Sequence, residues 1–352
     1  MRVLICPDKF KGSASAAEVC VAIAAGLADC LGSGVAFESV PLADGGDGTL
    51  AVLAATPGAQ ILTALVTGPL GEPVSAPWAL LADGTAVIEM AQASGLALVS
   101  GPLRAVAATT FGTGELIRLA IDAGATRCVV GVGGSATTDG GLGALDALGW
   151  SLHGMSVQVA TDVTTRFVEA ARVFGPQKGA SPDEVVLLTR RLESLADRYR
   201  DELGRDVRDL ERSGAAGGLA GGLAALGANL VSGFDMVADV VGLDQALERA
   251  DAVVTGEGRY DETSFVGKPV GEVLQRARGL GLPVVVVCGS SDPTVHHLVD
   301  GVIRLVDLAP TPEQAMADPT PWLREAGRLL GASLEQQHAD RLARHTVDLP
   351  PS

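Results

Sequence analysis

At 352 residues, the chain is long enough to bury a large core and to form two domains. Hydrophobic residues make up 47% of it, which excludes low-complexity disorder and places the 45 glycines in a folded, turn-rich protein. Its formal charge of −16 repels phosphate backbones and anionic lipid, so we expect no nucleic acid and no membrane surface among its partners.

Along the chain, short apolar runs that are closed by Gly, Pro or Asp predict strands covered on both faces. These runs are Arg2–Cys6, Val35–Pro41, Ala86–Met90, Arg127–Val132, Ala252–Thr255, Val284–Cys288 and Val302–Val306. Amphipathic helices are predicted between them. The first follows a capping box at Ser15–Glu18, and the clearest begins after Ser181, with Pro182 in its first turn. This alternation indicates an α/β protein.

The order of the elements predicts a discontinuous first domain. We expect the N-terminal strands and the strands after about Leu282 to share one sheet, with the middle of the chain inserted between them. The predicted boundaries are residues 1–65 plus 282–352 for the discontinuous domain and residues 66–281 for the inserted one.

The cysteines and the N-terminus indicate the cellular compartment in which the protein is expected. The five cysteines show no metal-ligand spacing and lie mostly in apolar runs, which is typical of buried, reduced thiols. The first residues, MRVLICPDKF, predict a strand followed directly by charge, without a signal-peptide pattern. No apolar run approaches the length needed to span a bilayer. We therefore expect a soluble, cytoplasmic protein.

Five segments combine glycine with acidic, hydroxyl or lysine residues just beyond a predicted strand, where ligands bind in α/β sheets. They are Pro7–Ser13, Ala43–Thr49, Gly131–Gly141, Phe174–Gly179 and Thr255–Asp261. Glycine lets successive backbone N–H groups approach phosphate oxygens, and helix N-termini add a favourable dipole. The residues predicted to bind nucleotide phosphates are Gly45, Gly46, Gly48, Thr49, Gly133, Gly134, Ser135, Gly256, Glu257 and Gly258.

Phosphoryl transfer also needs carboxylates for Mg²⁺ and cations for the transferring group. The same segments and their neighbours supply the carboxylates Asp8, Asp44, Asp139, Glu257 and Asp261 and the cations Lys9, Lys11, Lys178 and Lys268. This inventory indicates a kinase that uses ATP and Mg²⁺. Each segment alone also has a structural reading: Gly-Gly-Asp-Gly is a common turn, Ser135 can cap a helix, and Lys178 can be a solvated surface residue.

Two standard nucleotide-binding motifs give little support to other classes of protein. No GxxxxGK[ST] sequence occurs, which excludes a P-loop NTPase. Gly131–Ala136 fits the G-x-G-x-x-A dinucleotide pattern, but the residues after it, Thr137–Gly141, are poorly suited to a helix packed closely on a strand. An NAD-dependent oxidoreductase stays open as an alternative to the kinase.

The segments PDKFKGS, PLADGGDGT, GVGGSATTDGG, FGPQKGA, GAAGG and TGEGRYD occur here in the order seen in bacterial glycerate kinases, and the chain resembles that family from Met1 to about Pro310. The resemblance implies two α/β domains, one discontinuous and flavodoxin-like and the other inserted, with the active site in the cleft between them. It also implies transfer of the γ-phosphoryl group of ATP to a hydroxyl of D-glycerate, which gives phosphoglycerate and ADP.

The chain departs from the family pattern in two places. After Leu145–Gly149 the family carries a longer segment, which is shortened here to Trp150–Val159, and a following Asn-Pro pair is replaced by Thr165-Arg166. Near Ser213–Gly217 the run is also poorer in glycine than in the family. Two alternatives follow from these departures. One is a kinase of a related small hydroxy acid, and the other is a catalytically impaired member that binds its ligand as a regulator.

The resulting hypothesis for the mechanism gives each group of residues a role. The expected catalytic residues are Asp8, Lys11, Asp44, Asp162 and Lys178; the expected substrate-binding residues are Lys9, Ser13 and Lys268; the expected Mg²⁺ ligands are Asp44, Asp139 and Asp261. A carboxylate, Asp8 or Asp162, would orient or deprotonate the acceptor hydroxyl, while a lysine neutralises the transferring phosphoryl group or the glycerate carboxylate. Either hydroxyl of glycerate can be the acceptor in this scheme, and a homodimer is possible.

Overall fold

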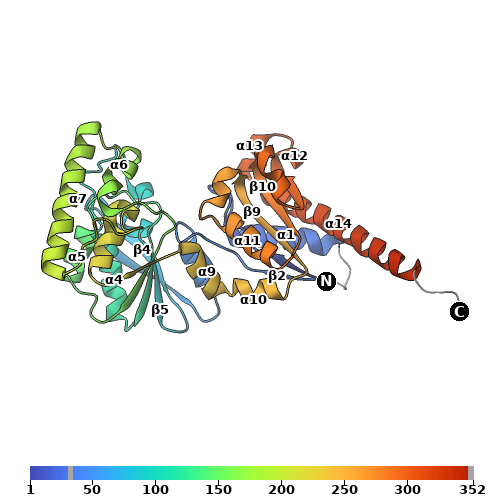
Figure 1. Ribbon diagram of the computed structural model, residues 1–352, viewed down its shortest axis with the longest axis horizontal. Helices are drawn as coiled ribbons and strands as arrows, with labels where there is room; N and C mark the ends of the chain where they lie inside the picture. The colour runs from blue at the N-terminus through green and yellow to red at the C-terminus, as the bar shows by residue number, and fades with distance from the viewer. Residues whose placement is uncertain (31–34, 348–352) are drawn as a thin grey trace. The chain divides into compact units, whose positions relative to one another are not determined.

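The computed structural model describes the backbone of residues 1–30 and 35–347 and side chains up to residue 333, and it divides into two compact units. Unit 1 consists of Met1–Leu42 and the chain from Val241 onward, and unit 2 consists of Ala43–Val240 (Figure 1). The sequence had placed these boundaries at residues 65/66 and 281/282. The segment after Val241 belongs to unit 1 because its strand, Ala252–Tyr260, pairs with strands from both ends of the chain.

Unit 1 contains a five-stranded sheet in the order β11-β10-β9-β1-β2, and all its neighbouring strands are parallel. The strands are β1 (Arg2–Ile5), β2 (Ala36–Ser39), β9 (Ala252–Tyr260), β10 (Val284–Ser291) and β11 (Gly301–Arg304). Counted within unit 1, this is the 2-1-3-4-5 strand order of flavodoxin-like folds. The expected flavodoxin-like, discontinuous architecture is confirmed, and its topological switch point lies between β1 and β9.

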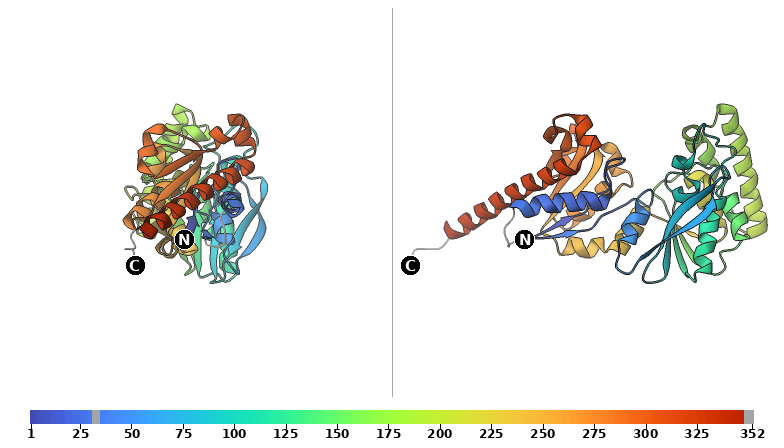
Figure 2. Two further views of the ribbon diagram at one scale, coloured as in Figure 1. Left: turned by 90° about the vertical axis from the view of Figure 1, so that its right-hand side faces the viewer. Right: turned by 180° about the vertical axis from the view of Figure 1, so that it is seen from behind.

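The helices of unit 1 are α1 (Ala16–Cys30), α10 (Leu243–Glu248), α11 (Pro269–Gly279), α12 (Leu305–Leu308), α13 (Pro312–Ala317) and α14 (Thr320–Val347). The helices α1 and α14 lie side by side although they come from opposite ends of the chain (Figure 2). A β-carbon at Gly26 would collide with the carbonyl oxygen of Arg324, so glycine permits this close approach. Asp29 accepts hydrogen bonds from Arg324 and Arg328 at the same contact.

Unit 2 contains a six-stranded sheet in the order β3-β4-β5-β6-β7-β8. An antiparallel hairpin, β3 (Gln60–Thr67) and β4 (Pro73–Leu80), is followed by the parallel strands β5 (Thr85–Glu89), β6 (Arg127–Gly131), β7 (Ser156–Ala160) and β8 (Asn229–Val231). Its helices are α2 (Thr49–Ala54), α3 (Ala91–Ser94), α4 (Phe111–Asp122), α5 (Leu142–Leu148), α6 (Ala170–Phe174), α7 (Pro182–Leu203), α8 (Leu219–Ala225) and α9 (Gly233–Val241). The carboxyl ends of β5–β8 therefore share one edge.

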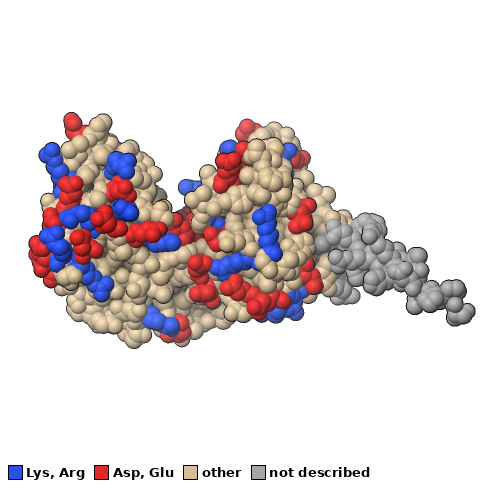
Figure 3. Space-filling view, in the orientation of Figure 1, with Lys and Arg blue, Asp and Glu red and all other residues tan. Residues whose placement is uncertain are grey.

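Local sequence signals account for the helix starts. Ser15 and Glu18 form the expected capping box before α1: the Ser15 N–H donates to the Glu18 carboxylate, and the Glu18 N–H donates to the Ser15 hydroxyl. Ser181 and Glu184 do the same before α7. Figure 3 shows acidic and basic side chains interspersed over the α7 surface, where Arg198 pairs with Glu202.

The expectations for cysteines and membrane spans can also be compared with the structure. All five cysteines are free, and Cys6, Cys20, Cys128 and Cys288 are buried. Burial raises the pKa of the Cys128 thiol to about 12, so this thiol is unreactive in the folded chain. No helix in the described part of the chain combines the length and apolar character needed to cross a bilayer.

Candidate functional site

In unit 2, the loop between Asp44 and Gly48 lies on the carboxyl ends of β6 and β7. A β-carbon at Gly45 would come within 2.6 Å of the Cα of Gly233, and one at Gly133 would come within 2.7 Å of the Cα of Gly46. The loop, the end of β6 and the start of α9 thus pack backbone against backbone, which only glycine allows. Close packing therefore accounts for several of these glycines without any ligand.

Some of the amides predicted to bind phosphate have partners inside the protein. The Gly46 N–H donates to Asp44 Oδ1 (3.0 Å), and the Thr49 N–H donates to the Gly46 carbonyl (3.2 Å). The buried Glu89, at the end of β5, accepts the Leu50 N–H (2.7 Å) at the N-terminus of α2. Burial raises the pKa of Glu89, while the amides of Leu50 and Gly48 lower it. The sequence did not single out Glu89, because its contact with the start of α2 joins residues that are 39 positions apart in the chain.

The turn after β6 keeps its amides available. Gly134 has a φ of +69°, and its carbonyl accepts the Leu96 N–H. Within the described part of the chain, the N–H groups of Gly133, Gly134 and Ser135 donate to no other residue. The helix after this turn, α5, begins only at Leu142, so the turn is not the strand–turn–helix of a dinucleotide-binding fold.

Lys178 lies beside this turn and is 1% exposed. Its Nζ donates to Ser135 Oγ (2.8 Å) and to the Thr137 carbonyl, and it lies 5.9 Å from the centroid of the Phe174 ring. Burial lowers the pKa of Lys178 to about 7, and the charge of Asp139 opposes this shift. The side chain is therefore a buried amine at the edge of the sheet, which rules out the solvated-surface reading.

Asp139 is committed to the protein. Its Oδ2 accepts hydrogen bonds from the N–H and hydroxyl of Thr110 (both 2.8 Å) and from the Gly143 N–H (3.2 Å), and its Oδ1 accepts the Gly141 N–H (3.1 Å). These donors leave little capacity for a metal ion. Asp139 thus fixes the loop before α5.

Asp162 and Asp44 lie around the first residue of α9. Asp162 Oδ1 accepts from the Ser232 hydroxyl (3.1 Å) and the Gly233 N–H (2.9 Å), and Oδ2 accepts the Phe234 N–H (3.3 Å). Burial raises the pKa of Asp162, and the charge of Asp44 adds to the rise. Asp44 Oδ1 accepts the Gly46 N–H, whereas its Oδ2 accepts no hydrogen bond from the described residues.

In unit 1, the segment after β1 lies along β9 at the switch point. The Asp8 N–H donates to the Gly256 carbonyl (2.8 Å), and a β-carbon at Gly258 would lie 3.6 Å from the Lys11 nitrogen. Asp8 is 7% exposed and lies 3.8 Å from Lys9 Nζ. Lys11 and Ser13 belong to the turn closed by Phe10 and Ala14, in which the Ser13 N–H donates to the Phe10 carbonyl.

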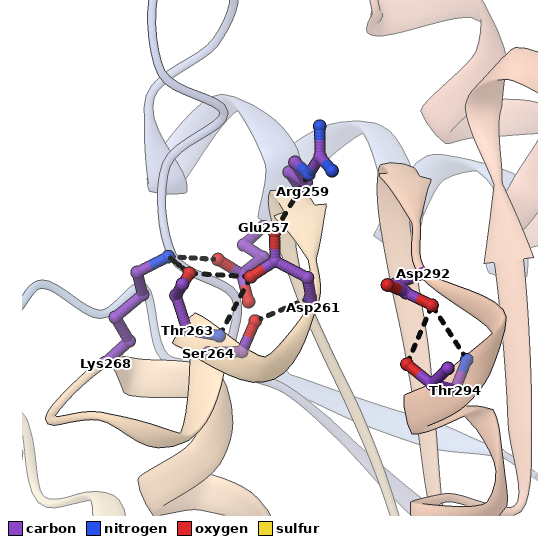
Figure 4. Close-up of polar contacts among 8 residues, drawn as sticks. All are labelled: Glu257, Arg259, Asp261, Thr263, Ser264, Lys268, Asp292 and Thr294. Atoms are coloured by element: carbon purple, nitrogen blue, oxygen red, sulfur yellow. Dashed lines mark hydrogen bonds and ion pairs between the residues drawn. The ribbon is translucent and has the colours of Figure 1, made fainter.

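Glu257 and Lys268 form an ion pair at the same edge of unit 1 (Figure 4). Lys268 Nζ lies 3.4 Å from Glu257 Oε2 and 3.0 Å from Thr263 Oγ1. Glu257 is 5% exposed, and its buried Oε1 has no hydrogen-bond partner among the described residues. Burial raises the pKa of Glu257, although Ser264 and Lys268 offset part of the rise. The unpaired oxygen is a polar contact available to a ligand.

Asp261 is engaged in the turn that follows β9. Its Oδ1 accepts the N–H and hydroxyl of Thr263 (2.9 and 2.6 Å), and its Oδ2 accepts Arg259 Nε (2.8 Å). These contacts, led by the Thr263 hydroxyl, lower the pKa of Asp261. Asp292 and Thr294 repeat the turn after β10 (Figure 4). The Asp261 carboxylate therefore serves turn structure.

The predicted residues thus gather in two groups. Unit 1 brings together the segment from Asp8 to Ser13 with Gly256–Gly258, Asp261 and Lys268, and unit 2 brings together Asp44–Thr49, Gly133–Ser135, Asp162 and Lys178. Both groups lie at the carboxyl ends of parallel strands. Such edges, with glycine turns, lysines and buried carboxylates, define an α/β enzyme that binds an anionic small molecule.

The comparisons with known proteins place the chain more narrowly. The model of the glycerate kinase family matches residues 3–156 and 150–335, and the chain belongs to this family. It is 38% identical to a glycerate kinase of Bacillus subtilis and 39% identical to a glycerate 2-kinase of Escherichia coli, covering in each case 95% of this chain and 98% of the relative. A crystal structure of a protein assigned as glycerate kinase 2 from Salmonella typhimurium is 34% identical, with a TM-score of 0.80 over 96% of this chain and 99% of that one.

Family membership confirms the expected class, a kinase that transfers a phosphoryl group from ATP to a hydroxyl. The alignment with the Bacillus subtilis relative spans 376 positions, more than the 352 residues of this chain. The relatives therefore carry residues that this chain lacks. The family match falls into two ranges that overlap at residues 150–156, at the start of the segment expected to be shortened.

Proposed function

We propose that the chain phosphorylates a hydroxyl of D-glycerate with ATP, giving phosphoglycerate and ADP. Besides family membership, one observation carries this proposal. Lys178 is a buried amine whose Nζ donates a hydrogen bond to Ser135, beside three N–H groups that donate to no described residue. An ammonium and a row of amides in a site of low dielectric suit the oxygens of a phosphoryl group. Lys9 and Lys11 of unit 1 are further candidate cations, and Glu257 with Lys268 is a further candidate contact for the substrates.

We propose Asp44 as the carboxylate that holds Mg²⁺. Asp261 and Asp139 were the other candidates from sequence, but their oxygens accept hydrogen bonds from protein donors. Asp44 keeps one oxygen without a partner among the described residues, where no cluster of three metal-binding side chains occurs. One carboxylate fits Mg²⁺, which retains waters and takes its other ligands from the nucleotide phosphates. When bound, the ion would neutralise charge on those phosphates.

The acceptor hydroxyl needs orientation and little acid–base assistance, because a loose phosphoryl-transfer transition state requires mainly positioning and charge neutralisation. We propose Asp8 for this role because it lies 3.8 Å from Lys9 Nζ, a candidate cation for the phosphoryl group, whereas Asp162 accepts three hydrogen bonds at the start of α9. We assign Asp162 to holding α9 in place.

The test is an ADP-release assay with ATP and a panel of D-glycerate, L-glycerate, lactate and glycerol, with ³¹P and ¹³C NMR to identify the phosphorylated hydroxyl. We expect turnover with D-glycerate. Turnover with another hydroxy acid, and none with D-glycerate, would favour the alternative that the chain is a kinase of a related small hydroxy acid. The shortened segment after residue 150 is the observation that supports this alternative. ATP binding without turnover of any acceptor would favour the catalytically impaired family member. A rise in Tm with NADH and none with ATP would contradict the kinase altogether.

We also propose that the protein lies in the cytoplasm, where ATP is available and its free thiols stay reduced.

We propose further that the chain forms a homodimer through the edge strand β3. This strand has no charged residue in a chain of charge −16, and it exposes Ile61 (65%) and Leu65 (75%). Long uncharged edge strands pair readily with a second copy. Light scattering should give a dimer that Leu65→Lys separates; a monomeric wild type would contradict the proposal.

A further inference from the structure

Arg212 adopts a backbone conformation that is unfavourable for its side chain. Its φ is +71°, in the left-handed region, where glycine is free of strain and a β-carbon is not. The position lies just before the buried run Ser213–Gly217. An arginine kept in a glycine-like conformation suggests a role for its side chain.

The side chain of Arg212 reaches the end of β7. Its Nη1 donates to the Thr161 carbonyl and lies 3.9 Å from Asp162 Oδ1. The side chain is 30% exposed, and neither Nε nor Nη2 donates to another described residue. A guanidinium has five N–H donors in a planar fork, so most of this fork remains available to a ligand.

Backbone hydrogen bonds join Arg212 and its neighbour to the loop after β7. The Arg212 N–H donates to the Thr164 carbonyl (3.4 Å), and the Gly214 N–H donates to the Thr165 carbonyl (2.9 Å). Thr165 follows residues 150–156, where the two matched ranges of the family model overlap. The loop after β7 and the buried run Ser213–Gly217 are therefore adjacent within unit 2.

Carboxylates near the Arg212 fork set its chemistry. Asp162 accepts the Gly233 and Phe234 N–H groups at the start of α9, and the Asp44 carbonyl packs against Gly233. Because Asp162 Oδ1 lies 3.9 Å from Arg212 Nη1, an anion would bind here only through directed hydrogen bonds to the fork. A carboxylate, which matches the fork with two parallel bonds, meets this condition.

We propose that Arg212 binds the carboxylate of the acceptor and so contributes to acceptor specificity in this chain. The proposal rests on the proposed kinase function and adds a residue that sequence reasoning did not single out. A phosphate oxygen of ATP offers related chemistry, but the amides and Lys178 already provide for phosphate at the end of β6. The acceptor is therefore the assigned partner of Arg212.

The test compares Arg212→Gly, Arg212→Lys and Arg208→Gln, a control arginine that pairs with Asp197 on the surface. In Arg212→Gly, the strained conformation is relieved, so Tm should be unchanged or higher. We expect its KM for D-glycerate to rise by about 10- to 100-fold, with the KM for ATP within about twofold.

Two further measurements test the role of the guanidinium. Arg212→Lys should restore only part of the affinity for D-glycerate, because lysine lacks the planar fork of donors. Added guanidinium should partly lower the KM of Arg212→Gly for D-glycerate. Arg208→Gln should match the wild type.

Calorimetric titration of D-glycerate into the wild type and Arg212→Gly gives a readout that does not depend on turnover. Weaker glycerate binding in the variant supports the assignment. If Arg212→Gly leaves the KM and the affinity for D-glycerate unchanged, with or without a change in Tm, Arg212 has only a structural role. A rise confined to the KM for ATP would overturn the acceptor assignment in favour of phosphate. A wild type that binds D-glycerate but does not phosphorylate it would contradict the proposed function and leave the binding comparison valid.

Discussion

The charge of the buried Lys178 side chain depends on pH near neutrality. Burial lowers its pKa from an ordinary value of 10.5 to about 7. Between these two values the unfolded chain binds the proton and the folded chain does not, so folding stability increases as pH rises through this range. Phosphate binding needs the charged form, so affinity for ATP should change in the opposite direction.

We therefore predict that the KM for ATP increases above about pH 7 in the wild type. Lys178→Met should remove this dependence, lower kcat/KM by at least about 100-fold, and flatten the increase in Tm between pH 7 and 9. Steady-state kinetics and thermal melts over this range provide the measurement, with Lys268→Met as a partly exposed lysine control for the stability effect. Identical pH profiles in the wild type and Lys178→Met would show that another group titrates.

Asp44 provides a second prediction for a single residue, because its two oxygens have different environments. Asp44→Asn retains Oδ1, which can still accept the Gly46 N–H, and replaces Oδ2 with a donor. We expect kcat to fall by at least about 100-fold with Tm nearly unchanged. The exposed neighbour Asp47 supplies the matched control, Asp47→Asn. Near-normal activity and an unchanged Mg²⁺ dependence in Asp44→Asn would remove Asp44 from the site.

Among the elements, the α1–α14 pair shows how a glycine can determine the approach of two helices. Gly26→Ala would place a methyl group against the Arg324 carbonyl, so the helices must separate. We predict a loss of about 1–3 kcal/mol of folding free energy. Gly279→Ala, at the end of α11 with no atom within 4 Å of the added carbon, should instead be neutral or stabilising by up to about 1 kcal/mol. Urea denaturation of both variants measures the difference; equal midpoints would argue against tight packing at Gly26.

The elements also show how far the sequence alone could lead. Strands buried on both faces, such as β6 and β10, were predictable because their apolar runs are uninterrupted. The hairpin β3–β4 was missed because one face is open to solvent: Ile61, Thr63 and Leu65 alternate with core residues. Apolar residues on that open face hide the alternation that normally marks a one-sided strand.

Within the candidate site, the sequence identified residue types but could not distinguish their uses. A glycine needed for close backbone packing, such as Gly46 or Gly133, is identical in sequence to one that binds phosphate. Asp139 looked available to a metal because its partner Thr110 lies 29 residues away in the sequence. Glu89 lies 39 residues from Leu50, which it holds. Such long-range hydrogen bonds depend on the completed fold, which local patterns do not encode.

At the scale of the whole molecule, each unit has its own hydrophobic core. One cluster in unit 1 surrounds β1 and β10, and separate clusters in unit 2 surround the six-stranded sheet and α7. Units with separate cores can unfold as separate cooperative blocks. The cysteines report on them individually, because Cys128 lies in β6 of unit 2 and Cys6 and Cys288 lie in the core of unit 1.

We predict that thiol labelling in increasing urea, read by mass spectrometry, gives one midpoint for Cys6 and Cys288 and a different midpoint for Cys128. Cys30, which is only partly buried, should react without denaturant and serves as the internal control. Because ATP is assigned to the Lys178 side of unit 2, saturating nucleotide should raise the Cys128 midpoint more than the Cys6 midpoint. A single midpoint for Cys6, Cys128 and Cys288 would show that the chain unfolds as one cooperative block. An equal shift of both midpoints with nucleotide would contradict the assignment of the nucleotide to unit 2.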